Sequence, residues 1–229
     1  MFKEIRKKIE AKRESENFFW NFFYSVKDLL YKTALGMKLK KSSNFFVELI
    51  VAKHMKVPGV FVETGTYNGG TTNRVLREFK TIHTIELSEK WYKNALHEFK
   101  GHKNVFCHHG DSAIILEKLL PTINESVLFY LDAHFSGGTT ALGKDANPLL
   151  RELAVISKRE YQDIIFIDDL EQMGRSGTMG TEGHAFYPPT KFDWSNITKA
   201  SIEKALGKKI LDCEEKENKL IIWKLGNKI

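Results

Sequence analysis

From about residue 43 onward, short apolar runs alternate with amphipathic stretches, and this alternation constrains the fold more than any other feature. The apolar runs have the length of strands and carry little charge, which is typical of strands buried on both faces. The stretches between them have helical length and periodicity. Strands are predicted at 59–63, 81–86, 104–108, 126–132 and 163–168, with helices at roughly 70–79, 88–99, 111–119 and 146–158. The pattern predicts an α/β fold, a doubly wound, mostly parallel sheet with helices on both faces.

The last third of the chain departs from this alternation. Residues 208–213 and 219–224 are apolar runs joined by a charged segment, which predicts two strands connected by a short turn. Between the fifth strand and this hairpin, residues 171–196 contain four glycines at three-residue spacing, together with Arg175, Tyr187 and Trp194. A stretch of this length and composition predicts a substrate loop or lid, the alternative being a disordered loop without function.

The N-terminal residues 1–42 are predicted to form a separate basic and aromatic helical segment, followed by a single domain at 43–229. Residues 1–41 hold eleven Lys/Arg and five Asp/Glu, whereas the rest of the chain holds 24 of each, so the whole net charge of +6 comes from this segment. Six of the seven residues at 18–24 are aromatic. Such a helix either packs on the domain or on a second copy in a homo-oligomer, or lies in a membrane interface as a peripheral contact. The neutral domain argues against nucleic acid as a partner.

Two cysteines, Cys107 and Cys213, are too few to indicate a disulfide framework or a zinc site. The N-terminus has no signal-peptide pattern, and no apolar run approaches the length of a membrane span. These observations lead us to expect a cytoplasmic protein, with membrane association only through the N-terminal segment.

A glycine-containing loop, ETGTYNGG at residues 63–70, lies between the first predicted strand and the following helix. Glycines at this position let the backbone turn tightly and approach a ligand closely. The spacing from Glu63 through Gly65 to Gly69 differs from the G-x-G-x-x-G pattern that binds pyrophosphate, and no P-loop lysine follows. The loop is therefore either a site for a nucleoside-sized ligand or a simple strand-to-helix turn.

Acidic residues at the next two strand ends favour the ligand. Glu86 ends the second strand, where its carboxylate could accept hydrogen bonds from both hydroxyls of a ribose. Asp111 follows the third strand and either bonds an adenine amino group or caps the next helix. Three strand ends that carry the expected residues in order are more specific than any one of them.

The series ETGTYNGG, TIEL, HHGDS and YLDAH resembles motifs one to four of class I S-adenosylmethionine-dependent methyltransferases, over roughly residues 58–170. The resemblance implies a seven-stranded sheet whose last strand is antiparallel, with S-adenosylmethionine lying across the strand tips. It implies that Glu63, Gly65 and Gly69 line the methionine end, that Glu86 holds the ribose, and that Asp111 and Ser112 hold the adenine. The further cofactor-binding residues that it implies are Thr66, Tyr67, Thr71, Thr72 and Asp132.

Three further acidic residues end the fourth and fifth strands, Asp132 on one and Asp168 and Asp169 on the other. Neighbouring strands would bring these carboxylates together, where they repel one another unless a cation balances them. Mg²⁺ suits such oxygen ligands. The alternative is that Asp132 contacts cofactor or substrate directly while Asp168 and Asp169 cap loops. The arrangement is similar to metal-dependent O-methyltransferases of the catechol and macrolide-sugar types.

His134, two residues beyond Asp132, is the candidate general base for deprotonating an acceptor hydroxyl, with His184 in reserve. A loop histidine bonded to the backbone is the alternative. The stretch LDAHFSGG and the helix start NPLLREL also resemble bacterial methyltransferases of surface-glycan biosynthesis, so the expected acceptor is a sugar or nucleotide sugar. Competing hypotheses are a same-fold enzyme without metal, such as an N-methyltransferase or aminopropyltransferase, and a non-catalytic binding protein.

Overall fold

The computed structural model describes residues 57–134, 143, 146–180, 182, 189–207 and 209–227. The predictions for residues 1–42, for the domain boundary at 42/43 and for His184 lie outside these residues. None of the helices described is long and apolar enough to cross a membrane.

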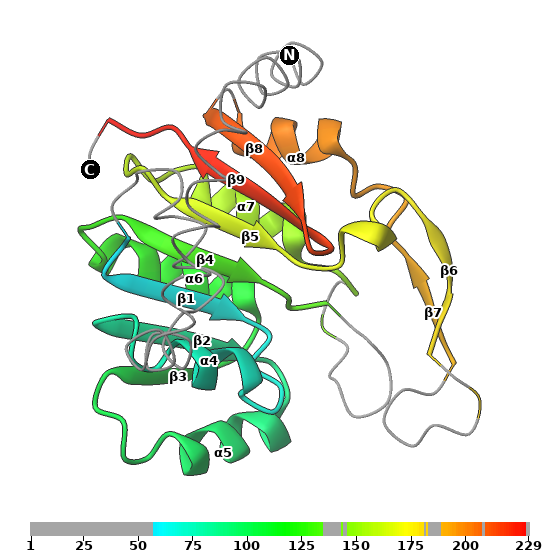
Figure 1. The fold of residues 1–229 in the computed structure, drawn as a ribbon. Helices are drawn as coiled ribbons and strands as arrows, with labels where there is room; N and C mark the ends of the chain where they lie inside the picture. Colours follow the sequence, from blue (N-terminus) through cyan, green and yellow to red (C-terminus); the bar gives the residue numbers. More distant parts are fainter. Residues whose placement is uncertain are drawn as a thin grey trace, which may run out of the picture. The chain divides into compact units, whose positions relative to one another are not determined.

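Seven strands form one sheet in the order β3-β2-β1-β4-β5-β9-β8 (Figure 1). β1 to β5 are all parallel, whereas β9 runs antiparallel to both β5 and β8. This topology confirms the predicted fold class, including the antiparallel last strand. The strands are β1 (Val60–Thr64), β2 (Thr81–Glu86), β3 (Val105–His109), β4 (Val127–Leu131), β5 (Ile164–Ile167), β8 (Ile210–Lys216) and β9 (Lys219–Lys224).

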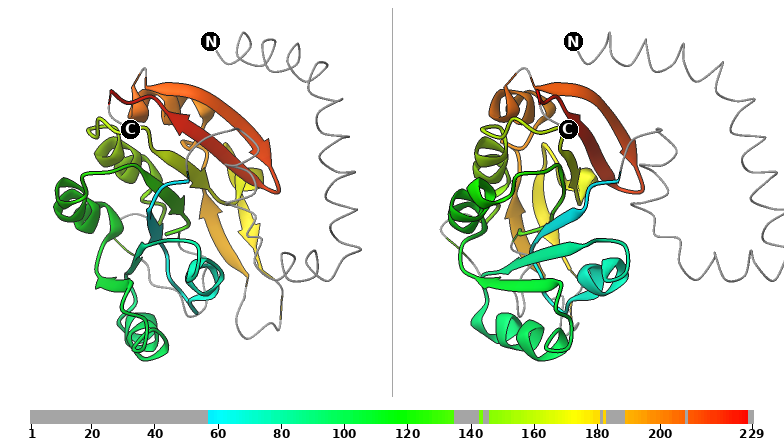
Figure 2. Two further views of the ribbon diagram at one scale, coloured as in Figure 1. Left: turned by 60° about the vertical axis from the view of Figure 1, so that its left-hand side comes forward. Right: turned by 90° about the vertical axis from the view of Figure 1, so that its left-hand side faces the viewer.

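Helices cover both faces of the sheet (Figure 2). Three of them pack side by side on one face, α6 (Ser112–Leu119), α7 (Leu149–Ile156) and α8 (Lys199–Leu206). α4 (Gly70–Val75) lies on the other face, and α5 (Glu89–Glu98) packs against β2 and β3. β1, β4 and β5 are buried along their whole length, as expected for strands covered on both sides.

A second, two-stranded sheet interrupts the segment that was predicted as a long loop at 171–196. β6 (Ser176–Met179) pairs antiparallel with β7 (Thr190–Asp193), after the short 3-10 helix η2 (Leu170–Gln172). This ribbon extends away from the main sheet beyond the carboxyl end of β5 (Figure 1). The prediction of a loop missed these strands because most of their residues are polar and exposed, so that no buried face marks them.

A buried ion cluster joins the amino end of β5 to β9 and to the end of α7. Asp163 accepts hydrogen bonds from Arg159 Nε at 3.1 Å and from the Val127 amide at 3.1 Å, and lies 3.3 Å from Lys224 Nζ. The Asp163 and Lys224 side chains are fully buried. The cluster satisfies its charges internally, at the end of the sheet opposite to the strand tips discussed next.

Candidate functional site

The loops after β1 and β4 meet at Gly65. Its φ of 84° is left-handed, and a Cβ added there would lie 2.3 Å from the Asp132 carbonyl oxygen. The Asp132 amide in turn donates to the Thr64 carbonyl at 3.1 Å. Only glycine allows this approach, because any side chain would push the two loops apart. The fold thus places the first predicted loop directly against the first predicted metal ligand.

Glu63 lies beneath this loop and is 1% exposed. One of its carboxylate oxygens accepts hydrogen bonds from the hydroxyls of Thr72 and Thr84, both at 2.6 Å. Burial raises the pKa of Glu63 to about 7, although these two hydrogen bonds oppose the shift. The hydroxyl of Thr66 is 2.5 Å from that of Thr84. Glu63 therefore ties β1, β2 and α4 together under the loop, and its predicted contact with a ligand stays a prediction.

Gly69 and Tyr67 give the loop its shape. Both have left-handed φ values, 79° and 47°, and Gly69 is the N-cap of α4. A Cβ on Gly69 would come within 2.9 Å of the Phe99 ring. The ring of Tyr67 packs against that of Trp91 at 4.5 Å between centroids. The predicted cofactor residue Thr71 is half-buried at the start of α4.

Glu86 is placed at the carboxyl end of β2 as predicted, and its carboxylate is fixed by the backbone. It accepts the amide of Tyr67 at 2.8 Å and that of Ser88 at 2.7 Å, one on each oxygen. Each carboxylate oxygen can accept more than one hydrogen bond, so both retain capacity for ligand hydroxyls. The backbone thus holds Glu86 as a rigid double acceptor beside the glycine loop.

Asp111 is engaged by the protein itself. It caps α6, accepting the Ile114 amide at 3.2 Å, which confirms the capping alternative. It also pairs with both terminal nitrogens of Arg151 on α7, at 3.0 and 2.8 Å. The hydrogen bonds from Arg151 lower the pKa of Asp111. Arg151 was not singled out from the sequence. An adenine contact from Asp111, or from buried Ser112, stays a prediction.

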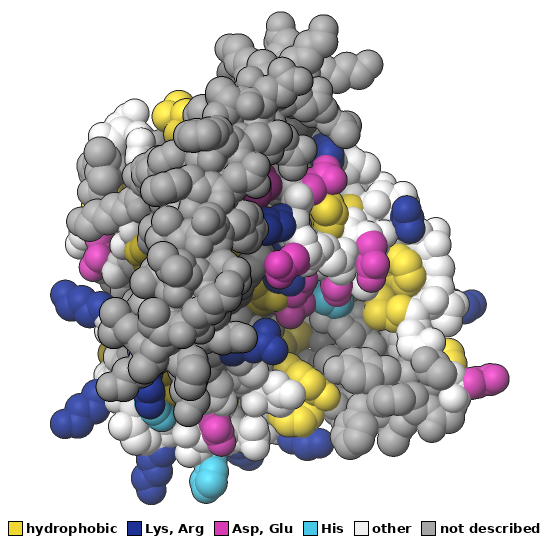
Figure 3. Space-filling view, in the orientation of Figure 1, with side chains coloured by type: hydrophobic (Ala, Val, Ile, Leu, Met, Phe, Trp, Pro, Cys, Tyr) yellow, Lys and Arg dark blue, Asp and Glu magenta, His cyan; other side chains and the backbone are white. Residues whose placement is uncertain are grey.

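His134 lies between two of the predicted metal ligands. Its Nδ1 is 3.2 Å from an Asp132 carboxylate oxygen, and its Nε2 is 3.1 Å from one of Asp169. The His134 side chain is 9% exposed, against 33% for Asp132 and 27% for Asp169. Acidic side chains gather beside a histidine where β4 and β5 end (Figure 3). Among the described residues, the histidine thus contacts two carboxylates.

The two carboxylates determine the charge of His134. Burial by itself lowers its pKa, but the hydrogen bonds and charges of Asp132 and Asp169 outweigh burial and raise the pKa to about 10. Partial desolvation raises the pKa of Asp132, which the contact with His134 partly reverses. At neutral pH, His134 is therefore an imidazolium ion that donates from both ring nitrogens.

Asp168 turns away from this group. It pairs with Lys219 Nζ at 2.9 Å and accepts hydrogen bonds from the Tyr130 hydroxyl and the Asp169 amide. The predicted metal set of Asp132, Asp168 and Asp169 stays a prediction, and in the structure a lysine already balances Asp168. Within the described residues, the atoms that could hold a metal ion together come from Asp132, His134 and Asp169, all within 4.8 Å of one another.

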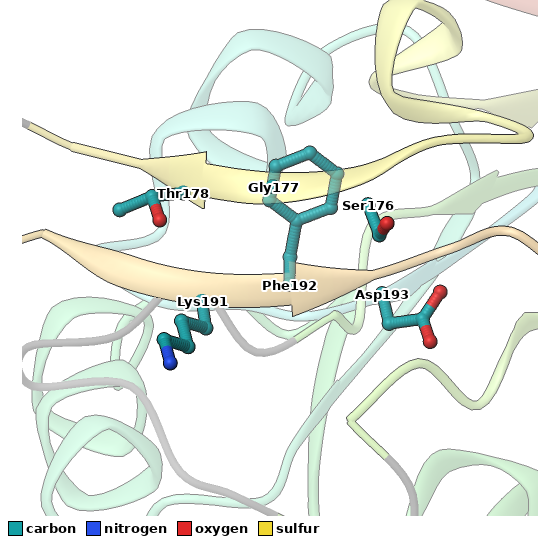
Figure 4. A pocket seen from close by; sticks show the side chains of 6 residues that line it. All are labelled: Ser176, Gly177, Thr178, Lys191, Phe192 and Asp193. Atoms are coloured by element: carbon teal, nitrogen blue, oxygen red, sulfur yellow. The ribbon is translucent and has the colours of Figure 1, made fainter.

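An aromatic path connects His134 with the ribbon of β6 and β7. Trp194 is 3% exposed and contacts His134 edge-on, at 4.8 Å between ring centroids. Phe192 contacts Trp194 at 6.4 Å. The Phe192 ring crosses over Gly177 on the opposite strand, whereas Lys191 points to the other side (Figure 4). Phe192, Gly177 and Lys191 line an open pocket of about 490 Å³, together with Ser176, Thr178 and Asp193.

No family model matches the sequence, and no curated protein matches it. Among solved structures, the chain is similar to an S-adenosylmethionine-dependent methyltransferase from Clostridium acetobutylicum, with 16% identity over 91% of this chain and 99% of that one, at a TM-score of 0.49. It is also similar to the methyltransferase PaMTH1 of Podospora anserina, bound to SAH, with 16% identity over 86% of each chain and a TM-score of 0.48. A third is CalS10, an amino pentose methyltransferase of Micromonospora echinaspora, with 11% identity over 85% of this chain and 98% of that one, at a TM-score of 0.47. The fold assignment itself rests on the strand order.

Proposed function

We propose that the protein transfers a methyl group from S-adenosylmethionine to an oxygen atom of a small polar acceptor. One observation carries the proposal: an acidic residue lies within two positions of the carboxyl end of each of β1 to β4, and the loop after β1 requires Gly65. These residues are Glu63, Glu86, Asp111 and Asp132. In open parallel sheets, ligands bind outside the carboxyl ends of the strands, where the strand order reverses. In this sheet the reversal lies between β1 and β4.

The residues at these strand ends fit the chemical groups of the cofactor. Glu86 offers two fixed oxygens to the ribose hydroxyls, and the Tyr67 and Trp91 rings stand beside it. Asp111 and Ser112 are next along the sheet, toward the adenine in the proposed orientation. The methionine end would then lie over Gly65, next to Asp132.

The acceptor hydroxyl must be aligned with the sulfonium methyl group and must lose its proton. Asp132 is placed to accept that proton, since its side chain is the most exposed of the acidic groups around His134. In this proposal Asp132 replaces His134 as the general base, because a doubly protonated imidazole has no lone pair that could accept a proton. The role of His134 is to orient Asp132. The products are the methyl ether, S-adenosylhomocysteine and one proton.

A divalent ion stays part of the proposal with changed ligands. Asp132, His134 and Asp169 would hold it once His134 had lost the proton on its coordinating nitrogen, because a metal ion binds neutral imidazole, and a bound ion would lower the pKa of a coordinated hydroxyl. Their donor set of two carboxylates and one imidazole suits Mn²⁺ as well as Mg²⁺. Lys219 and His134 already balance the carboxylates, so the charge repulsion that motivated the ion is partly relieved by the protein itself.

The ribbon supports a sugar or nucleotide sugar as the acceptor. The ring of Phe192 suits the apolar face of a sugar ring, and Arg175, directly before β6, could pair with a phosphate. This extends the sequence-based assignment of 171–196 as a substrate segment, with a glycan-biosynthesis enzyme as the broader expectation.

The first test is calorimetric binding of S-adenosylmethionine and S-adenosylhomocysteine. We expect binding by the wild type and its loss in Glu86→Ala, because the ribose acceptor is removed. Arg74→Ala, which changes an exposed side chain on α4, is the control and should bind as the wild type does. A wild-type protein that binds neither ligand would exclude methyl transfer and favour a binding protein of another kind.

The second test is a methyl-transfer screen with sugars and nucleotide sugars, with Mg²⁺, with Mn²⁺ and with a chelator. The ligand set predicts that Asp169→Asn weakens Mn²⁺ binding more than Asp168→Asn does, as measured by calorimetry. The reverse order would restore the set derived from the sequence.

N-methyl transfer is the second candidate, and the acidic surroundings of His134 favour it, because they would attract a cationic amine (Figure 3). Small amines therefore belong in the same screen. If the protein methylates an amine and a chelator does not change the rate, N-methyl transfer is favoured over transfer to oxygen.

A further inference from the structure

The corner after β5 holds its second aspartate in a costly backbone conformation. Asp169 has a φ of 55°, a left-handed value that residues other than glycine rarely adopt. This conformation directs the Asp169 carboxylate to His134, at 3.1 Å. A backbone strained in this way persists only when surrounding contacts hold it, and the contacts therefore identify what shapes the corner.

The contacts come from the turn between β8 and β9. Glu217 and Asn218 have φ values of 48° and 59°, the pattern of a two-residue hairpin turn. The Asn218 carbonyl accepts the Leu170 amide at 2.9 Å, and its side-chain oxygen accepts the Glu171 amide at 2.9 Å. Its side-chain nitrogen is 3.4 Å from Asp169 Oδ1, the carboxylate oxygen that does not face His134. A turn that only connected two strands would need none of these contacts, yet one asparagine reaches three consecutive residues of the corner.

The next residue fixes the other aspartate. Lys219 Nζ lies 2.9 Å from Asp168, and the Tyr130 hydroxyl donates to the second oxygen of the same carboxylate. The Lys219 and Asp168 side chains are 19% and 17% exposed, so the pair is largely shielded from water. With Asp168 held there, Asp169 is the carboxylate of the pair that reaches His134.

We propose that Asn218 and Lys219 are positioning residues of the site, and that the β8–β9 turn sets which of the two aspartates reaches His134. The turn acts through Asp168 and Asp169 and touches no ligand in this proposal. Its effect on turnover rests on the proposed methyl transfer, whereas its effect on the contact between Asp169 and His134 does not.

Two glycine substitutions in the same turn distinguish the effect of the Asn218 side chain from the effect of the turn backbone. Asn218→Gly keeps a residue that tolerates positive φ and keeps the carbonyl that binds Leu170, but it removes both side-chain contacts with the corner. Glu217→Gly places glycine at the other left-handed position, where the native side chain is exposed. It is the matched control.

The contact between Asp169 and His134 is observed directly by NMR of the imidazole N–H protons, assigned through their loss in His134→Gln. We expect Asn218→Gly to shift the Nε2–H signal or broaden it by exchange with water, and Glu217→Gly to leave it unchanged. In turnover with the best acceptor, we expect kcat of Asn218→Gly to fall about tenfold, the size typical of lost supporting contacts, with unchanged affinity for S-adenosylhomocysteine.

An Nε2–H signal in Asn218→Gly that matches the wild type would overturn the proposal, and so would an equal change in Glu217→Gly, which would assign the effect to the turn backbone. Failure of the proposed function is recognised separately. It would appear as a wild type that neither binds S-adenosylhomocysteine nor transfers methyl groups, while the imidazole signals still report whether Asn218 positions Asp169.

Discussion

Gly65 is the residue on which the approach of the β1 and β4 loops depends. Gly65→Ala would place a methyl group against the Asp132 carbonyl and would also disfavour the φ of 84°. We expect the variant to lose measurable binding of S-adenosylhomocysteine and to be less stable than the wild type by more than the roughly 1–2 kcal/mol of left-handed strain alone. Calorimetry and urea unfolding measure the two effects.

Two other glycines provide controls for this substitution. Gly174 has a φ of 74° but no atom within 4 Å of an added Cβ, so Gly174→Ala isolates the cost of the backbone conformation. Gly101 has neither constraint, and Gly101→Ala should behave as the wild type. Equal destabilisation by Gly65→Ala and Gly174→Ala would show that the loops do not need the close approach.

Glu63 makes stability depend on pH. Its pKa is raised to about 7 in the folded protein, from an ordinary value of 4.5, so the folded state binds the proton more tightly. The resulting stabilisation is complete below pH 4.5 and is lost as the pH rises to about 7, by about 1.4 kcal/mol per pH unit. Between pH 4 and pH 8, we expect the free energy of unfolding of Glu63→Gln to rise relative to the wild type by roughly 3 kcal/mol.

Urea unfolding at several pH values checks this difference, and comparison of the two proteins cancels the effect of every other titrating group. Glu152, whose pKa burial also raises to about 7, contributes to both curves alike. Parallel stability profiles for the two proteins would show that folding does not raise the pKa of Glu63.

At the scale of elements, the pairing of β5 with β9 depends on the buried ion cluster at Asp163. Asp163→Ala would leave Arg159 and Lys224 buried without their shared carboxylate, and we expect a loss of about 3–5 kcal/mol in the free energy of unfolding. The control is Glu117→Ala, which removes an exposed pair with Lys158 and should cost less than about 1 kcal/mol. Similar losses in both variants would contradict the structural importance of the cluster.

The sequence predicted those helices and strands whose position is determined by one dominant physical effect. β1 to β5 lie within a residue or two of the predicted ranges. For β1, β4 and β5 the reason is burial on both faces, which demands uninterrupted apolar residues. α8 was not predicted, although Ile202 and Leu206 at a spacing of four mark its buried side. β6 and β7 lacked such a signal, since each has only four residues and none of them is buried.

The candidate site also contains residues that the sequence could locate and others that it could not distinguish. The predicted strand ends place Glu63, Glu86, Asp111 and Asp132 where the structure has them, because parallel strands bring their carboxyl ends to one edge, and the contacts of these residues with a ligand stay predictions. Sequence order could not tell Asp168 from Asp169, which are adjacent. The choice between them depends on a left-handed φ and on Lys219, 51 positions away. No local pattern encodes a contact over that distance.

At the scale of the whole molecule, the single seven-stranded sheet should make unfolding cooperative, so that a ligand at one half protects the other. At 100 times its Kd, S-adenosylhomocysteine should stabilise the protein by about 2.7 kcal/mol and raise Tm by roughly 5–10 °C. Differential scanning calorimetry measures this shift. A separate transition that does not respond to the ligand would show that β8 and β9 unfold independently of β1 to β4, the strands whose ends would contact the nucleoside.

The β8–β9 turn also has a consequence for how the protein is made. Ribosomes deliver β1 to β5 first, and with them every strand end that would contact the nucleoside. A nascent chain that stops short of residue 217 lacks both the partner of β5 and the asparagine that holds Asp169. If the proposed function holds, such a chain binds the methyl donor before its reaction centre is aligned, and competence for chemistry arrives only when the β8–β9 hairpin has been synthesised.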